Sequence, residues 1–452
     1  MNSLSGNLTR KQVLKFIFES STYGNLGLFI GAGFTKAVLN NNNDDKIALS
    51  WGELLKRVSE KLGVDYNKIP KEGSGYPEIA SYICKKYSSD SKIDYEQSLK
   101  KLKIEIAALT SWYPEHKQRE KYSEYLGWLS PSWIITTNYD MVIESLLLGK
   151  SIPLEPNDSL SSPKSVIPVY HLHGLRTNPE SIVITQEDYI SLFRPNEYRQ
   201  IKLALTIKES TTVLLGYGLG DVNVLTALDW SKNVFSSEKE NYPNDIIQII
   251  RSSSPEKSPY RDEHGVIIIE TGDLSEFAEE FNNIRIIEEQ KKEKERKILI
   301  TLEKLLANPD KDTIDLFIDD DSFRKKILDT LSEFSINLIS GFISFLDKCI
   351  DETWERSRPN GAFEGYNKNL TIILDILLAF PLTKFPPALF QAVVQSLERV
   401  GPYIGKNSGQ SWDADRTWEK RKSQLSTEVV DELKNISAQH GYYFVTNLVK
   451  NL

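Results

Sequence analysis

Short apolar segments alternate with amphipathic ones over roughly the first 285 residues of the chain. Each apolar segment has the length of a buried strand, and several are rich in β-branched residues. The amphipathic segments have the spacing of helices. This alternation predicts an α/β fold with a Rossmann-like, mostly parallel, doubly wound sheet. The predicted strands lie at 26–30, within 132–140, and at 166–172, 181–185, 213–215, 245–251 and 265–270, and the accompanying helices lie at 8–22, 141–148, 187–193 and 274–281.

A purely helical stretch interrupts this alternation after the first strand. Ser50 has the position of a helix N-cap, with Glu53 three residues later, and the helix it opens extends to about Leu62. Further helical periodicity occurs at 76–88, 95–110 and 115–129. We therefore expect a helical module, at about 52–130, inserted into the α/β core.

The pattern changes again near residue 285. A segment dense in alternating charge, Glu288 to Lys297, comes first, and the remainder has only helical periodicity. We expect one domain over 1–285 and an all-α C-terminal domain over 286–452, whose size is ordinary for a domain. Its apolar stripes and aromatic residues could fill its own core, or part of its surface could bind a partner or a second copy of the chain.

Composition narrows the possible partners and compartments. A net charge of −8 provides no overall positive field, so direct binding of nucleic acid is not expected. The two cysteines, Cys84 and Cys349, cannot build a four-cysteine zinc site, and they fit a reducing compartment. The N-terminus resembles no signal peptide, and the most apolar stretch, Leu370 to Phe380, is too short to span a bilayer. We therefore expect a cytoplasmic protein without a membrane segment or a bound metal.

Two predicted strands end in glycine-rich turns. The first strand runs into Gly31-Ala32-Gly33, and the strand at 213–215 runs into Gly216-Tyr217-Gly218. Glycines at such turns let the backbone approach a phosphate closely and present N–H groups to it. A single Gly-x-Gly is weak evidence for a nucleotide site.

Polar side chains follow two other predicted strands. Asn138 can donate and accept hydrogen bonds, and Asp140 could either contact a ligand or simply cap the following helix. His173 could act as a general base or be satisfied by backbone hydrogen bonds. His171 lies on the same face of its strand, but no third residue nearby suggests a metal site. In parallel sheets ligands bind beyond the carboxyl ends of the strands, where all these residues are expected.

Taken together and in this order, the motifs resemble those of the sirtuin family. They are Gly31-Ala32-Gly33-Phe34-Thr35, Thr136-Thr137-Asn138-Tyr139-Asp140, His171-Leu172-His173-Gly174 and Gly216-Tyr217-Gly218. The form Thr-Thr-Asn-Tyr-Asp is most similar to bacterial sirtuin-like domains of anti-phage defence. The zinc module of protein-deacetylating sirtuins is missing, and an asparagine-rich loop followed by Ser50-Trp51-Gly52-Glu53 stands where they have a proline-aspartate-phenylalanine-arginine segment. Both departures argue against deacylation and leave NAD binding in place.

The resemblance implies an activity and roles for particular residues. It implies an NAD glycohydrolase that uses NAD as substrate, depletes cellular NAD on infection and thereby causes abortive infection. Asn138 would hold the ribose or the attacking water, His173 would accept a proton, and Asp140 would bind the nicotinamide carboxamide. Residues Gly31, Ala32, Gly33, Phe34 and Thr35, together with Gly216, Tyr217 and Gly218, would hold the pyrophosphate and the adenine ribose.

The same resemblance implies partners. Sirtuin-like defence effectors work in multi-subunit complexes with an ATPase or helicase-type protein or an Argonaute-type protein, and we expect this chain to form a homo-oligomer. The alternative is a non-catalytic sensor subunit that binds NAD or ADP-ribose, for which the glycine turns would be needed and His173 would not.

Overall fold

The protein is described here from a computed structural model. The described residues are 8–39, 48–70, 73–156, 158, 162–163, 165–192, 198–217, 245–334, 338–359, 361–450 and 452. They form two compact units, Met1–Glu289 and Gln290–Leu452, and each is described by itself.

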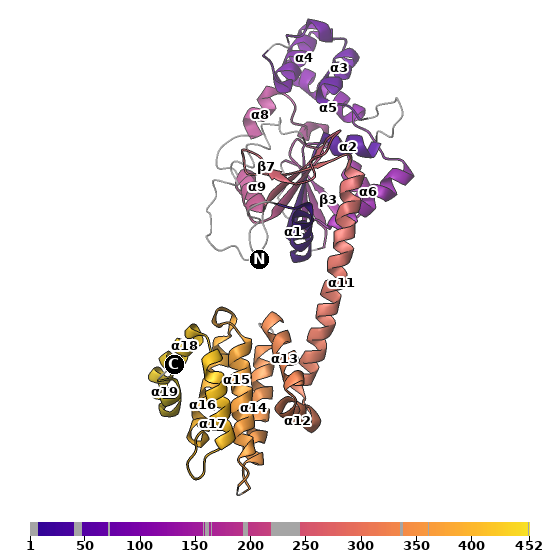
Figure 1. Cartoon of the computed structure of the whole chain (residues 1–452). Helices are drawn as coiled ribbons and strands as arrows, with labels where there is room; N and C mark the ends of the chain where they lie inside the picture. Colours follow the sequence, from indigo (N-terminus) through magenta and orange to yellow (C-terminus); the bar gives the residue numbers. More distant parts are fainter. Residues whose placement is uncertain are drawn as a thin grey trace. The chain divides into compact units, whose positions relative to one another are not determined.

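The first unit is built on a sheet of eight strands in the order β3-β4-β2-β1-β5-β6-β8-β7 (Figure 1). Every neighbouring pair is parallel except β7 and β8. The central strands are buried along their whole length, as parallel strands covered on both faces must be. The strands are β1 (Leu26–Ile30), β2 (Trp133–Thr136), β3 (Ser151–Leu154), β4 (Ile167–His171), β5 (Thr211–Leu215), β6 (Ile246–Arg251), β7 (Tyr260–Arg261) and β8 (Ile267–Thr271).

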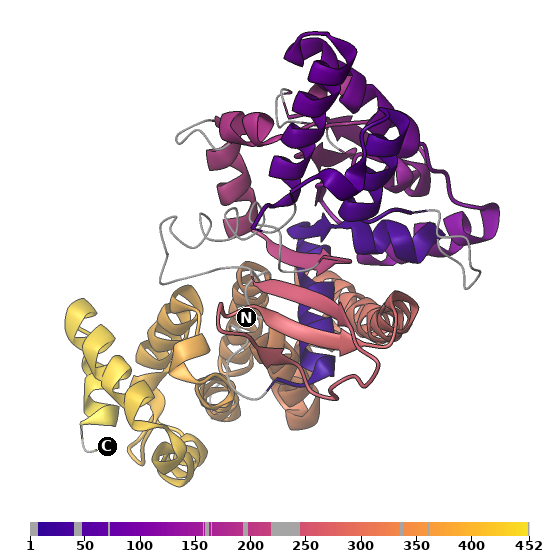
Figure 2. The same ribbon diagram turned by 90° about the horizontal axis from the view of Figure 1, so that it is seen from above.

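Alternating residues of the strands belong to two different cores. Leu28 and Ile30 of β1 belong to a core shared with helices on one face, while Phe29 belongs to a core on the other face that includes Leu203 and Ile207 of α9. Figure 2 shows helix α1, in indigo, lying against the sheet.

The helices of this unit are α1 (Arg10–Tyr23), α2 (Ala32–Leu39), α3 (Trp51–Lys61), α4 (Tyr76–Ser91), α5 (Tyr95–Leu109), α6 (His116–Leu129), α7 (Val142–Leu147), α8 (Gln186–Leu192) and α9 (Tyr198–Lys208). The prediction of a Rossmann-like α/β fold is confirmed.

Helices α3, α4 and α5 form the inserted module with a core of their own. Helix α3 begins as its sequence predicts, because the Ser50 hydroxyl accepts from the Glu53 N–H and the Glu53 carboxylate accepts from the Ser50 N–H at 2.7 Å. The module core also includes Tyr139 and Ile182, which belong to loops at the carboxyl end of the sheet. The module is therefore packed directly onto that end.

The prediction of a strand at 181–185 is wrong. Residues Ile182 to Ile184 are extended and buried, but they pair with no strand of the sheet. The Val183 N–H donates to the His173 carbonyl at 2.8 Å, and the Tyr139 hydroxyl donates to the Val183 carbonyl at 2.9 Å. An apolar, extended segment can thus be buried by crossing the strand ends instead of joining the sheet.

Two strands were not predicted. Strand β3 contains Pro153 and lies at one edge of the sheet, where only one neighbour requires its backbone groups. Strand β7 has two residues and lies at the other edge. Neither has the continuous apolar run of a central strand.

Helix α11 (Leu274–Ala307) is longer than predicted. The expected helix ended at residue 281, but the described helix continues through the charged segment and belongs to both units. Opposite charges one turn apart, such as Arg285 with Glu289 and Lys291 with Glu295, stabilise its exposed surface.

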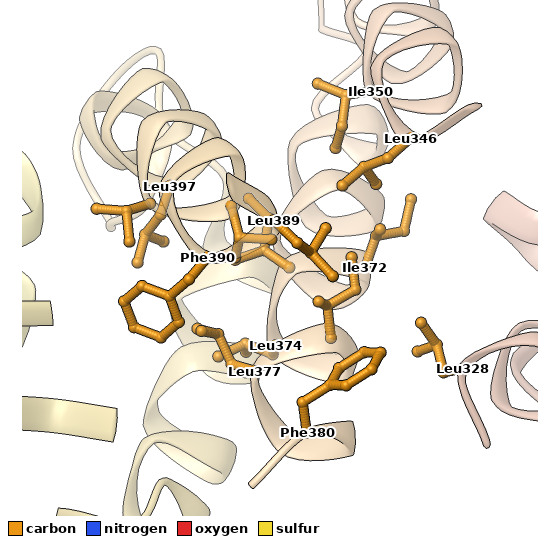
Figure 3. Close-up of a cluster of buried hydrophobic side chains, with 14 of the residues drawn as sticks. Leu328, Leu346, Ile350, Ile372, Leu374, Leu377, Phe380, Leu389, Phe390 and Leu397 are labelled. Atoms are coloured by element: carbon orange, nitrogen blue, oxygen red, sulfur yellow. The ribbon is translucent and has the colours of Figure 1, made fainter. Parts of the chain in front are cut away.

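The second unit is helical throughout its described residues, which confirms the all-α prediction. Leucines and phenylalanines of α15 and α16 point toward one another at its centre, as Figure 3 shows for Leu374, Leu377, Leu389 and Phe390. No helix among the described residues of either unit is both long and apolar enough to cross a membrane. The helices after α11 are α12 (Lys311–Asp319), α13 (Asp321–Phe334), α14 (Ile339–Arg356), α15 (Glu364–Ala379), α16 (Pro387–Val400), α17 (Trp412–Arg421), α18 (Thr427–His440) and α19 (Tyr443–Val449).

A buried arginine connects three helices of this unit. Arg324 of α13 is fully buried and donates to the Asp375 carboxylate of α15 at 2.6 Å and to the Phe317 carbonyl of α12 at 2.7 Å. Asp375 also accepts from Arg421 of α17 at 2.5 Å. Burying a guanidinium is tolerated only where acceptors surround it, as they do here.

We predict that Arg324→Ala lowers the free energy of unfolding of the second unit by about 3 kcal/mol, because buried acceptors lose their donor. Chemical denaturation of the full chain measures this change. Arg416→Ala is the control, since Arg416 is 76% exposed and forms only a surface pair with Asp413. A similar loss in both variants would contradict the role assigned to Arg324.

Candidate functional site

The register of the sheet brings the candidate motifs to one edge. Ile30 at the end of β1 pairs with Thr136 on one side and with Leu215 on the other, and Thr136 pairs in turn with His171. The residues that follow these four therefore emerge side by side. The chain extends from β1 first to β2 and later to β5 on the opposite side, so this edge is the topological switch point, where open α/β sheets bind ligands.

The two glycine turns contact each other through their backbones. The Gly33 N–H donates to the Gly216 carbonyl at 2.8 Å, and the Gly31 N–H donates to the Leu215 carbonyl at 3.0 Å. A β-carbon on Gly33 would lie 2.7 Å from the Gly216 oxygen, and one on Gly216, whose φ is +62°, would lie 2.0 Å from the Phe34 nitrogen. These glycines are thus required by the close approach of two strand ends. The Gly33 amide is used inside the protein instead of pointing to a ligand, and Gly218 lies outside the described residues.

A threonine hydroxyl connects the first glycine turn to the asparagine motif. The Asn138 side-chain amide donates to Thr35 Oγ1 at 3.0 Å, and this hydroxyl donates to the Asp140 carboxylate, 3.2 Å from Oδ2. Asp140 Oδ1 accepts from the Val142 N–H at 3.0 Å, so it also caps α7. The orientation of Asn138 is therefore fixed by Thr35, which is itself oriented by Asp140.

The carboxyl group of Asp140 is buried. Asp140 is 2% exposed. Burial raises the pKa of its carboxyl group to about 6, although the hydrogen bond from the Val142 N–H and the nearby His171 favour the ionised form. Its charge therefore changes close to neutral pH.

His171 fixes the backbone of Asn138. Its Nδ1–H donates to the Asn138 carbonyl at 2.9 Å, and its Nε2 lies 2.8 Å from Glu144 Oε1 on α7. Burial opposes the charged imidazole, but the hydrogen bond and charge of Glu144 outweigh it and raise the pKa of His171. An acceptor on each side therefore favours the protonated ring, which can donate from both nitrogens.

His173 is fully buried among aromatic rings. Its ring centroid lies 6.0 Å from that of Trp51, 6.4 Å from that of Tyr139 and 5.3 Å from that of Tyr189, whose hydroxyl is 3.5 Å from Nε2. Trp51 packs in turn on Tyr76. The inserted helices thus provide one wall of the environment of His173.

In the sequence, Trp51 stands out only as part of the Ser50–Glu53 segment, and Glu144, Tyr76 and Tyr189 were missed entirely. No local pattern marks these residues, because they reach the site from separate helices. Among the described residues, no three histidine, cysteine, aspartate or glutamate side chains are grouped so as to hold a metal ion.

A cavity of about 530 Å³ lies on the other side of the glycine turns. It begins at Gly33 and Gly216 and continues along the carboxyl ends of β6 and β8 to the start of α11. Helices α2 and α6 form its opposite wall, where the Tyr122 hydroxyl donates to the Ala37 carbonyl at 2.9 Å. We call it the β6–β8 cavity. Asn138 and His173 do not line it, so the polar residues and the cavity flank the glycine turns from opposite sides.

Comparison with known proteins agrees with this geometry. The family model described as "SIR2-like domain" matches residues 132–269, which include the asparagine motif, His171 and His173, strands β2 to β7 and the first part of β8. Residues 132–269 are therefore similar to a SIR2-like domain. This confirms the resemblance to sirtuins.

A curated relative has a related sequence. The "Defense-associated sirtuin 2" of Bacillus subtilis is 25% identical over 232 residues, which make up 49% of this chain and 21% of that protein. This chain therefore spans about a fifth of the length of that relative.

We predict that Asp140→Asn stabilises the protein near pH 7 by up to about 3 kcal/mol, because the folded state then no longer buries a carboxylate whose pKa has been raised from 3.8 to about 6. A raised carboxyl pKa means that the folded wild type binds a proton more tightly than the unfolded chain. Its stability should therefore fall as the pH rises from 4 to 6, and the advantage of the variant should vanish near pH 4.

Thermal unfolding of both proteins between pH 4 and 8 measures this dependence. The pKa of His171 is also raised, so its stabilising contribution is lost as the pH rises through the pKa of the folded state. The charge of Asp140 is one cause of that increase, so this loss should begin at lower pH in Asp140→Asn than in wild type. Asp312→Asn, at an exposed position, is the control. A constant difference between Asp140→Asn and wild type over the whole range would show that Asp140 is not the titrating group.

Proposed function

We propose that this protein is an NAD glycohydrolase, which cleaves NAD to nicotinamide and ADP-ribose, and that it acts as an NAD-depleting effector in anti-phage defence. The SIR2-like domain supports the use of NAD, and the printed name of the Bacillus subtilis relative supports the defence role. The single observation that carries the enzymatic proposal is the register of β2 with β4. Asn138 and His173 each lie two residues beyond the paired Thr136 and His171, at adjacent strand ends.

The reaction breaks the bond between the nicotinamide nitrogen and ribose C1′. The bonding electron pair leaves with nicotinamide, whose ring nitrogen becomes neutral, and C1′ develops oxocarbenium character as in glycoside cleavage. A water oxygen then bonds to C1′ and gives up a proton. Such a reaction depends mainly on positioning and electrostatic stabilisation.

Asn138 is suited to hold the ribose or the attacking water because its amide is oriented by Thr35. His173 would accept the proton of the water or of a ribose hydroxyl, since a neutral imidazole is a base near physiological pH. The rings of Trp51, Tyr139 and Tyr189 would exclude bulk water around it. Asp140, close to its own pKa at neutral pH, would bind the nicotinamide carboxamide.

The rest of NAD would extend across the glycine turns. The turn Gly31 to Thr35 and residues Gly216 to Gly218 would lie along the pyrophosphate, at the start of α2, where the positive end of the helix dipole favours an anion. The β6–β8 cavity would then take the adenosine. NAD enters this proposal as substrate, and no zinc is required.

We further propose that the protein works as a homo-oligomer, and that the Gln290–Leu452 unit binds another copy of the chain or a defence partner of the ATPase, helicase or Argonaute type. An enzyme that destroys NAD must be controlled, and a separate helical unit with its own core is a suitable place for such control.

Incubation of the purified chain with NAD should release nicotinamide, and Asn138→Ala and His173→Ala should each reduce the release at least about 100-fold, as expected for groups that stabilise or deprotonate the reacting atoms. Chromatography of the products measures this. The exposed histidine variant His264→Ala is the control. Binding of NAD without any release of nicotinamide would favour the sensor function, and release at the wild-type rate by both variants would disprove the assignment.

His171 should act as a positioning residue for Asn138. His171→Leu removes the donor to the Asn138 carbonyl and should lower kcat by about 10- to 100-fold with less change in KM, because small displacements of a catalytic group are costly.

Replacement of Glu144 separates positioning from charge. Glu144→Gln keeps a hydrogen-bond partner for Nε2 and should retain more activity than Glu144→Ala, in which that partner is lost. Steady-state kinetics of the three variants, with circular dichroism to verify folding, measure this. Equal activity of His171→Leu and wild type would refute the positioning role.

A further inference from the structure

The β6–β8 cavity is unusually cationic for this acidic protein. Lys36 of α2, Lys121 of α6 and Arg251 at the end of β6 all line it. Lys121 lies over the rings of Tyr122 and Tyr125, 6.0 and 5.7 Å from their centroids. Among the described carboxylates, none lies within 4.0 Å of the charged nitrogens of these three residues, so their charges are not neutralised by ion pairs within the described part of the chain.

The described lining of the cavity contains a single carboxylate, that of Asp273. Its Oδ1 already accepts from the N–H groups of Ser275 and Glu276, at 2.7 and 3.0 Å, at the start of α11. Sites that recognise an unmodified ribose present a carboxylate to its hydroxyl groups, whereas sites that accept a 2′-phosphate present an arginine. The cavity has an arginine, and one oxygen of its described carboxylate is engaged by the start of α11, which favours the second case.

Of these cations, Lys36 follows the first glycine turn on α2, whereas the strand order places Arg251 beyond the second glycine turn, on the side away from the first. Gly33 and Gly216 follow β1 and β5, whereas Arg251 ends β6, two strands away from β1. Strand spacing puts Arg251 about 10 Å across the sheet from the first glycine turn. If the pyrophosphate binds at the glycine turns, the Arg251 guanidinium remains available to bind a group farther along the ligand, on the adenosine.

We infer that the β6–β8 cavity binds a phosphate on the adenosine end of the ligand, so that the substrate class includes the 2′-phosphorylated dinucleotide NADP as well as NAD. This inference rests on the proposed function for the orientation of the dinucleotide. Ser275 lines the same cavity, and its hydroxyl adds hydrogen-bonding capacity near the bound phosphate.

Isothermal titration calorimetry of the full-length chain with NAD and with NADP tests this inference, using His173→Ala to suppress turnover. NADP should bind at least as tightly as NAD. Arg251→Glu should weaken NADP binding at least tenfold more than NAD binding, and rising salt should weaken NADP binding more steeply. Arg416→Glu, at an exposed position of the second unit, is the charge-matched control and should leave the ratio of the two dissociation constants unchanged.

The outcomes separate this inference from the proposed function. NADP binding at least tenfold weaker than NAD binding, or a ratio that Arg251→Glu does not change, would overturn the inference, while nicotinamide release from NAD by the unmodified chain would still support the proposed function. Conversely, tight and Arg251-dependent NADP binding without cleavage of either dinucleotide would support the cavity assignment and count against the glycohydrolase.

Discussion

The pairing of β1 with both β2 and β5 is the constraint on which the site depends. Ile30 is in register with Thr136 and Leu215, so the first glycine turn emerges between the asparagine motif and the second glycine turn. The two glycine turns can then approach until the Gly33 N–H donates to the Gly216 carbonyl. A side chain at either position would push these strand ends apart. The separation of the polar residues from the β6–β8 cavity follows from this single arrangement.

A second set of contacts turns the shared edge into a specific site. Asn138 is held from two directions, by Thr35 through its side chain and by His171 through its carbonyl. Each of these residues is oriented by a carboxylate, Asp140 or Glu144. Such a buried polar network is stable only when its members are satisfied, and its stability therefore depends on the protonation of Asp140 and His171.

The strand ends were predictable because buried parallel strands are short apolar runs, and the polar or glycine residues after them are visible in the sequence. The start of α3 was predictable for a similar reason, since the Ser50–Glu53 capping box is a local pattern. Local sequence patterns could not reveal the features that depend on the order of the strands or on loops that cross the strand ends. The extended segment Ile182 to Ile184 has a strand-like composition but passes over the strand ends, and only tertiary contacts reveal this.

The same limit applies to the residues around the candidate site. Glu144 and Tyr189 reach the two histidines from different helices, and the place of Arg251 beside the glycine turns follows from the pairing of β5 with β6. The sequence also suggested that the amides of the first glycine turn would be available to a phosphate. The structure uses the Gly33 amide to join two strand ends, which is a requirement of the fold itself.

The central claim is that NAD binds along this one edge of the sheet. Hydrogen–deuterium exchange of the His173→Ala protein, with and without NAD, tests it most directly, because exchange is measured segment by segment along the chain. We predict that NAD slows exchange in peptides that cover residues 31–36, 136–142, 171–176 and 214–217, and leaves the Gln290–Leu452 unit unchanged. Protection confined to other segments, or absent at NAD concentrations that saturate binding, would contradict the account.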